Sequence, residues 1–143
     1  MKLTLVALAL GAMALASSAS AAMHPELGAK LLGKNEVPKG SPKGDGIVNL
    51  TLNANKGSVC WTFDIAGIGK PAVAHIHKAR AGKAGPIVVP LGTAYKEKGC
   101  TKASKKTIAA IESRPNAYYV NVHTAKYPGG AIRGQLVVGM VHM

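Results

Sequence analysis

Large apolar side chains occupy every odd position of the stretch Val59-Cys60-Trp61-Thr62-Phe63-Asp64-Ile65. Successive side chains of a β-strand point to opposite faces of the sheet. The alternation therefore predicts a strand whose odd-numbered residues face a hydrophobic core. The even-numbered residues, Cys60 among them, are expected on the outer face.

Similar short runs recur along the chain, separated by turn residues such as Gly, Pro, Asn and Asp. We predict strands at 28–32, 46–52, 58–65, 73–78, 87–91, 117–123 and 131–138. Closely spaced strands of this kind are typical of an all-β sandwich or barrel. Only residues 104–113 are expected to form a helix, with Ser104 or Thr107 as its N-cap and Arg114-Pro115 at its end.

The N-terminus has the pattern of a secretory signal peptide. Met1-Lys2 is followed by an apolar run at 3–16 and by small residues at 17–22. The apolar run is too short for a membrane-spanning helix, and no later segment approaches the required length. We expect cleavage after Ala21 or Ala22, which gives a signal peptide at 1–22 and one domain at 23–143. The protein is expected to be secreted or periplasmic, without a membrane span.

Export changes the meaning of the two cysteines. In an oxidising compartment an even number of cysteines normally indicates a disulfide bond. We therefore predict a bond between Cys60 and Cys100, which would hold a lysine-rich segment against the outer face of the sheet. The alternative is a pair of free, buried thiols.

The chain is strongly basic, with 18 Lys and Arg residues against 6 acidic residues and a formal net charge of +12. Many of the lysines lie in predicted loops, namely Lys34, Lys39, Lys43, Lys96, Lys98, Lys102, Lys105 and Lys106. We interpret them as a solvated surface that attracts anionic envelope polymers without specificity. Nucleic acid is not an expected partner, because the chain is exported and its few aromatic residues are not interleaved with basic ones.

Three histidines occupy positions that a β-sheet can bring together. His75 and His77 are two residues apart in one predicted strand, and His123 ends another. Strand parity turns all three outward, together with Arg133, provided that their strands are neighbours. Three imidazoles form a metal shell that suits copper better than zinc, because affinity for divalent ions peaks at copper. The alternative is a metal-free, hydrogen-bonded polar patch.

Residues near the chain ends are further candidate ligands. Cleavage after Ala21 would leave His24 as the third residue, so that an amine, two amides and an imidazole could bind square-planar copper(II). Met140 and His142 near the C-terminus offer ligands that suit copper(I). A frayed terminal strand with ordinary methionines is the alternative. Glu36 and Asp64 are carboxylate candidates, and for Glu36 the alternative is a loop carboxylate that pairs with a lysine or with backbone amides.

Several ordered motifs resemble the CHRD (chordin-type) domain over nearly the whole predicted mature chain. They are Gly33-Lys34-Asn35-Glu36-Val37-Pro38, Ala74-His75-Ile76-His77 with Gly85-Pro86-Ile87-Val88-Val89-Pro90-Leu91, and Tyr119-Val120-Asn121-Val122-His123-Thr124 with Tyr127-Pro128-Gly129-Gly130-Ala131-Ile132-Arg133-Gly134-Gln135-Leu136. The resemblance implies an immunoglobulin-like antiparallel β-sandwich that is secreted or associated with the cell surface, and that stands alone in bacteria. It does not imply a settled biochemical activity.

A second resemblance concerns chemistry. The order of His75 and His77, then Ala84-Gly85-Pro86, then His123 and Arg133 is similar to that of the copper/zinc superoxide dismutases. That resemblance implies copper at the histidines and an arginine that attracts superoxide. Where that family has its metal-bridging histidine this chain has Ile87, and the zinc-loop ligands have no equivalent. A mononuclear site is therefore expected.

The sequence supports one leading hypothesis and two alternatives. The leading hypothesis is a secreted CHRD-type protein that binds copper through His75, His77 and His123, for copper binding or handling in the cell envelope. The first alternative is a metal-free structural or adhesive module that contacts anionic surface polymers or proteins. The second is a dismutase-like redox activity, which is the only enzymatic hypothesis, because hydrolase and nucleotide-binding motifs are absent.

Overall fold

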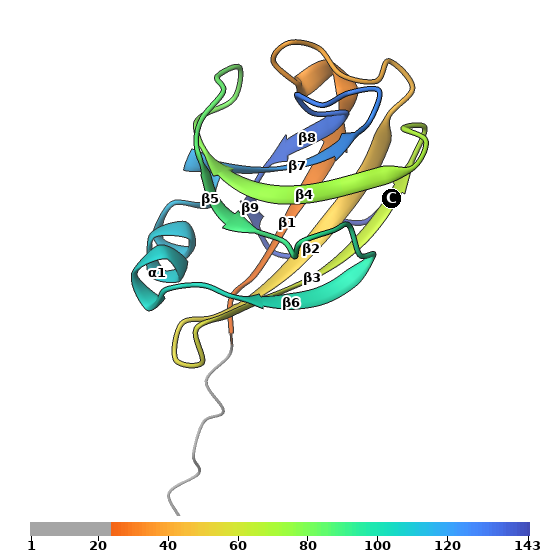
Figure 1. The fold of residues 1–143 in the computed structure, drawn as a ribbon. Helices are drawn as coiled ribbons and strands as arrows, with labels where there is room; N and C mark the ends of the chain where they lie inside the picture. The colour runs from red at the N-terminus through yellow and green to blue at the C-terminus, as the bar shows by residue number, and fades with distance from the viewer. Residues whose placement is uncertain (1–23) are drawn as a thin grey trace, which may run out of the picture.

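The computed structural model describes residues 24–143, so the predicted signal peptide lies outside the described part of the chain. Figure 1 shows strands as the dominant elements of this part. The strands are β1 (Glu26–Leu32), β2 (Asp45–Asn53), β3 (Ser58–Ala66), β4 (Pro71–Lys78), β5 (Ile87–Pro90), β6 (Lys98–Lys102), β7 (Tyr118–Thr124), β8 (Ile132–Gln135) and β9 (Val137–Val138). The helices are α1 (Lys105–Ser113) and two 3-10 turns, η1 (Gly33–Asn35) and η2 (Pro115–Ala117).

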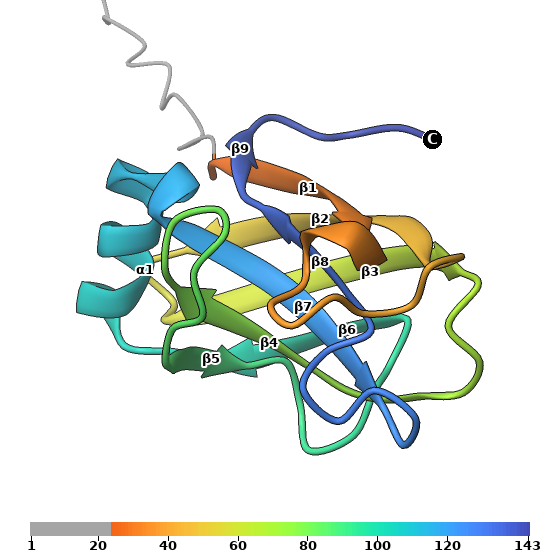
Figure 2. The same ribbon diagram turned by 90° about the horizontal axis from the view of Figure 1, so that it is seen from above.

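All nine strands belong to one antiparallel sheet, in the order β5-β4-β7-β8-β1-β2-β3-β6 with β9 beside β1. Figure 1 and Figure 2 show that this sheet curls strongly, so that it approaches a closed barrel. Side chains from β2 and β3 join side chains from β4 and β7 in a single hydrophobic core. The all-β prediction is therefore confirmed.

The alternation in β3 has the expected effect. Val59, Trp61 and Phe63 are at most 4% exposed, whereas the side chain of Cys60 points to the outer face. The Trp61 indole N–H donates a hydrogen bond to the carbonyl oxygen of Lys96 at 2.9 Å, so its one polar atom is satisfied inside the core. The predicted helix is also present, and Ser104 caps it by accepting a hydrogen bond from the amide of Thr107.

Two segments differ from the prediction. Residues Lys98–Lys102 form the edge strand β6, which the sequence pattern did not indicate because Gly and Lys are poor strand formers. The expected strand at 131–138 is divided at Leu136, whose amide bonds to the carbonyl of Tyr118. The chain then leaves β7, so that β9 pairs with β1 instead.

The predicted disulfide is present and joins β3 to β6. Cys60 and Cys100 lie directly opposite each other in the register of these two strands. Their separation of 40 residues corresponds to a loop-closure stabilisation of about 4 kcal/mol in the chain-entropy model. Cys100 is exposed and Cys60 half-buried, so the bond adds little to the packing of the core.

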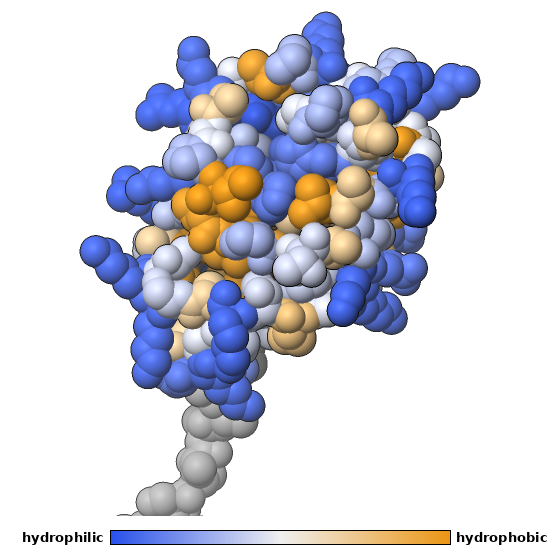
Figure 3. All heavy atoms as spheres, viewed as in Figure 1, coloured by the Kyte–Doolittle hydropathy of each residue, from blue (hydrophilic) through white to orange (hydrophobic). Residues whose placement is uncertain are grey.

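The surface carries most of the basic charge. Among the described residues a single ion pair is present, between Lys30 and Asp45 at 3.7 Å. Figure 3 shows hydrophilic side chains around the rim of the face seen in Figure 1, with an apolar patch over β5. Ile87, at 49% exposure, belongs to this strand. The described part of the chain contains no helix with the length and apolarity needed to cross a membrane.

We expect replacement of both cysteines by serine, Cys60→Ser with Cys100→Ser, to lower the free energy of unfolding by about 2–4 kcal/mol. Urea denaturation followed by circular dichroism measures this change. A reductant should destabilise the native protein by a similar amount and leave the double variant unchanged. Equal unfolding midpoints for the oxidised native protein and the variant would contradict this account.

Candidate metal centre

Strands β4 and β7 are neighbours, as the histidine prediction requires. In their antiparallel register His75 lies opposite Asn121, His77 opposite Tyr119, and Val73 opposite His123. The residues between them on these strands point the other way, into the core, where Ile76 is fully buried. All three histidines therefore project from the same outer face of the sheet.

The ring nitrogens of the three histidines converge. One ligand atom from each of His75, His77 and His123 can be chosen so that all lie within 4.8 Å of one another. His75 Nδ1 and His123 Nε2 are 3.1 Å apart. Two nitrogens bound to one ion at about 2.0 Å are roughly 2.8–3.3 Å apart, so this pair has the separation of a shared metal shell.

Backbone carbonyls fix which nitrogen of two histidines can bind a metal. His77 Nδ1 donates to the carbonyl of Gly85 and His123 Nδ1 to that of Pro128, each at 2.8 Å. The Nε2 atoms are therefore left to face the site, an arrangement that is typical of metal-ligating histidines. The sequence did not reveal these two carbonyls, because both come from loops whose path depends on the folded sheet.

Two of the three histidines, His75 and His77, are held in their neutral form. Burial, together with smaller electrostatic contributions from His123 and His77, lowers the pKa of His75 to about 4. Burial also lowers the pKa of His77, whose Nε2 atom is buried without a hydrogen-bond partner. Neutral imidazole is the form that binds metals, so the site needs little deprotonation to accept an ion.

Arg133 lies beside the histidines, as strand parity predicts, but the structure also buries it. The residue is 2% exposed, and its Nε donates to the carbonyl of Asn35 at 2.7 Å. The Cζ atom of its guanidinium lies 4.3 Å from the centre of the Tyr119 ring. The Tyr119 ring also stacks on the His77 ring, with 4.8 Å between the two ring centres. Strand parity predicts the direction in which a side chain points, but it does not predict whether a loop covers that side chain.

The candidate ligands at the chain ends do not join the cluster. His24 lies within hydrogen-bond distance of Asn53 at the end of β2. The C-terminal segment that carries Met140 and His142 is held along β2 by two hydrogen bonds between Asn49 and the backbone of Val141. Strands β8 and β1 separate β2 from β7. Glu36 and Asp64 are likewise outside the group of His, Cys, Asp and Glu residues found at the site.

Glu36, in the loop after η1, has a buried carboxyl group, and the sequence pattern did not indicate this burial. A loop carboxylate of this kind is usually solvated, yet Glu36 is 3% exposed. Its carboxyl group lies so close to Gly130 that a Cβ atom at this glycine would clash with Oε1. Burial raises the pKa of Glu36 from 4.5 to about 7, against the opposing effect of Arg133.

This raised pKa predicts a stability change with pH. Between pH 4.5 and about 7 the native state binds a proton that the unfolded state has released, so the stability contribution of Glu36 falls as the pH rises. Glu36→Gln removes this loss. Relative to the native protein, the variant should gain about 3 kcal/mol at pH 8 and little at pH 4.

Urea denaturation at several pH values measures this difference, in which the contributions of the histidines cancel. Glu26→Gln changes an exposed carboxylate and is the control, for which we expect no such trend. A constant offset between Glu36→Gln and the native protein across this pH range would contradict the assignment.

Comparison with known proteins agrees with this architecture. The family model described as the CHRD domain matches residues 27–136, which span β1 to the end of β8 and include all three histidines. Searches of curated proteins and of solved structures found no match. Because the model covers more than half of the sequence, the chain belongs to the CHRD domain family.

Proposed function

We propose that this protein binds a single metal ion, copper in preference to zinc, through His75, His77 and His123. The observation that carries the proposal is the convergence of three imidazole nitrogens within 4.8 Å, two of them oriented by backbone carbonyls. In the metal-free protein His123 Nε2 lies within hydrogen-bond distance of His75 Nδ1, at 3.1 Å, and of Asn121 Oδ1, at 3.0 Å. A metal ion would take the place of these contacts.

The donor set favours copper over other metals. The site offers imidazole nitrogens without carboxylate or thiolate, since both cysteines are in the disulfide. Imidazole suits copper and zinc, and affinity in the divalent series is highest for copper. The hydrogen-bonded, partly buried rings also require little reorganisation, which supports tight binding. The role that we infer is copper binding or handling outside the cytoplasm.

Copper titration of purified protein tests the proposal. We expect native protein to bind one copper ion per chain, and to bind copper more tightly than zinc. The triple variant His75→Ala, His77→Ala, His123→Ala should lose this binding. The double variant His24→Ala, His142→Ala removes two histidines outside the cluster and should retain it.

Metal analysis of protein purified from cells gives the independent readout. A native protein that takes up no more copper or zinc than the triple variant would refute the metal site. Loss of binding in the double variant alone would place the copper at the chain ends instead.

The extracytoplasmic role also depends on the signal peptide. We expect the exported protein to begin at Ala22 or Met23, because the small residues before these positions suit signal peptidase. Intact-mass measurement of protein from the periplasm or medium identifies the start. Retention of Met1 and Lys2 in the exported form would exclude cleavage at this position.

A further inference from the structure

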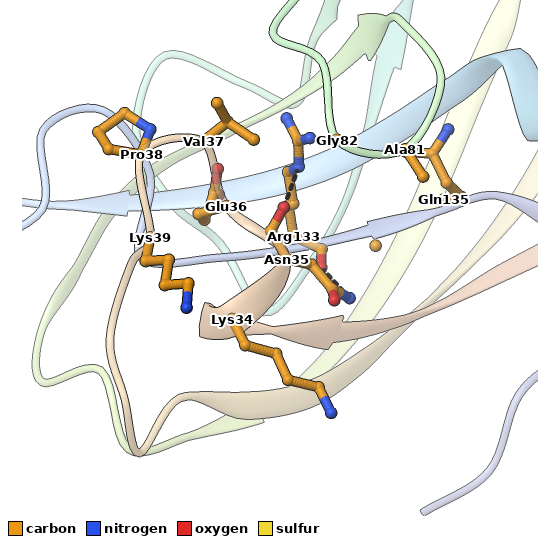
Figure 4. Close-up of a pocket in the computed structure, with 11 residues that line it drawn as sticks. Lys34, Asn35, Glu36, Val37, Pro38, Lys39, Ala81, Gly82, Arg133 and Gln135 are labelled. Carbon is orange, nitrogen blue, oxygen red and sulfur yellow. Dashed lines mark hydrogen bonds between the residues drawn. The ribbon is translucent and has the colours of Figure 1, made fainter.

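A second candidate site lies next to the metal centre but contains none of its histidines. It is a pocket of about 620 Å³ between the segment 34–39 and the loop at Ala81 and Gly82, with Arg133 and Gln135 of β8 also in its lining. Figure 4 shows these residues around the pocket. A pocket of this size can hold a small organic molecule.

Two side chains in the lining each have one buried polar atom that lacks a hydrogen-bond partner. Arg133 Nη2 and Glu36 Oε1 have no hydrogen-bond partner among the described residues, and the two residues are 2% and 3% exposed. They also form no ion pair with each other within 4.0 Å. Buried polar groups are nearly always paired, so two unpaired ones in one pocket indicate a missing ligand group.

The guanidinium of Arg133 is held in a fixed position. Its Nε donates to the carbonyl of Asn35, and the Asn35 side-chain amide donates back to the carbonyl of Arg133 at 3.3 Å. The face of the group stacks on Tyr119. Figure 4 shows the guanidinium reaching between Val37 and Gly82, two residues of the pocket lining. A donor fixed in this way loses little entropy when a ligand binds.

We propose that this pocket binds a hydroxy-carboxylate of the sugar-acid type, with the carboxylate at Arg133 and a hydroxyl group at Glu36. The planar guanidinium matches a carboxylate, whereas the Glu36 carboxyl group accepts a hydrogen bond from a hydroxyl. Lys34 and Lys39 supply two more positive charges at another part of the lining. The inference is independent of copper, because no metal ligand lines the pocket.

Two sources could present this chemistry, a free sugar acid or a uronic acid unit of an anionic polymer. D-glucuronate probes the first and an oligogalacturonate the second. Glucose, which lacks the carboxylate, and cyclohexanecarboxylate, which lacks the hydroxyls, are the matched control ligands. Calorimetric titration of the EDTA-treated protein measures binding of all four compounds without bound metal.

Three variants make the test specific. Arg133→Lys keeps the positive charge but removes the paired N–H donors of the guanidinium group, so the affinity should fall at least about tenfold. Ala81→Trp fills the pocket from an exposed loop position, leaves the core and the charge unchanged, and should abolish binding. Lys106→Ala removes one exposed positive charge on α1 and should bind as the native protein does.

The results of these titrations distinguish a free sugar acid from a polymer-borne unit. Binding of glucuronate that exceeds both control ligands about tenfold and is lost in Ala81→Trp supports a free sugar acid. The same dependence for the oligomer alone supports a polymer-borne unit. Binding that survives Ala81→Trp, or the absence of binding by both probes, overturns the proposal. The triple histidine variant should bind as the native protein does, so failure of the copper proposal would not affect this result.

Discussion

The register of β7 between β4 and β8 is the constraint on which the functional face of this molecule depends. It places His75 and Arg133 on opposite sides of Asn121, and His77 beside Tyr119. Burial of Val120 and Val122 on the inner face holds this register, because a slip by one residue would turn every side chain of the strand over. The packing of the core therefore determines the geometry of the metal site.

Much of this face could be predicted from the sequence because strand parity is a strict rule. The alternation around Ile76 and Val122 was enough to turn the histidines outward, whereas their grouping also required β4 and β7 to be neighbours. Parity contains no information about what lies above the sheet. The burial of Arg133 and Glu36 depends on loop paths, and the orientation of His77 depends on the carbonyl of Gly85. These features come from contacts between distant segments, which no local pattern encodes.

The polar groups without partners are distributed unevenly. Within the described residues three buried side-chain atoms lack a hydrogen bond, Glu36 Oε1, His77 Nε2 and Arg133 Nη2. Each such atom costs about 1–3 kcal/mol. None belongs to the apolar core, and all three lie at the two sites proposed above. These atoms therefore lie where a bound ligand or metal ion could form the interactions that they lack. The hydrophobic core and the disulfide offset the free-energy cost of leaving them without partners.

The position of the disulfide has a consequence for aggregation. Strand β3 is apolar on every second residue and would be a template for pairing with other chains if its edge were open. Strand β6 covers that edge with lysines at both of its ends, and charged edge strands resist further pairing. A short strand rich in Gly and Lys would ordinarily fray. The disulfide at the centre of β6 keeps this strand paired with β3. Formation of the disulfide therefore protects the protein from aggregation through the edge of β3.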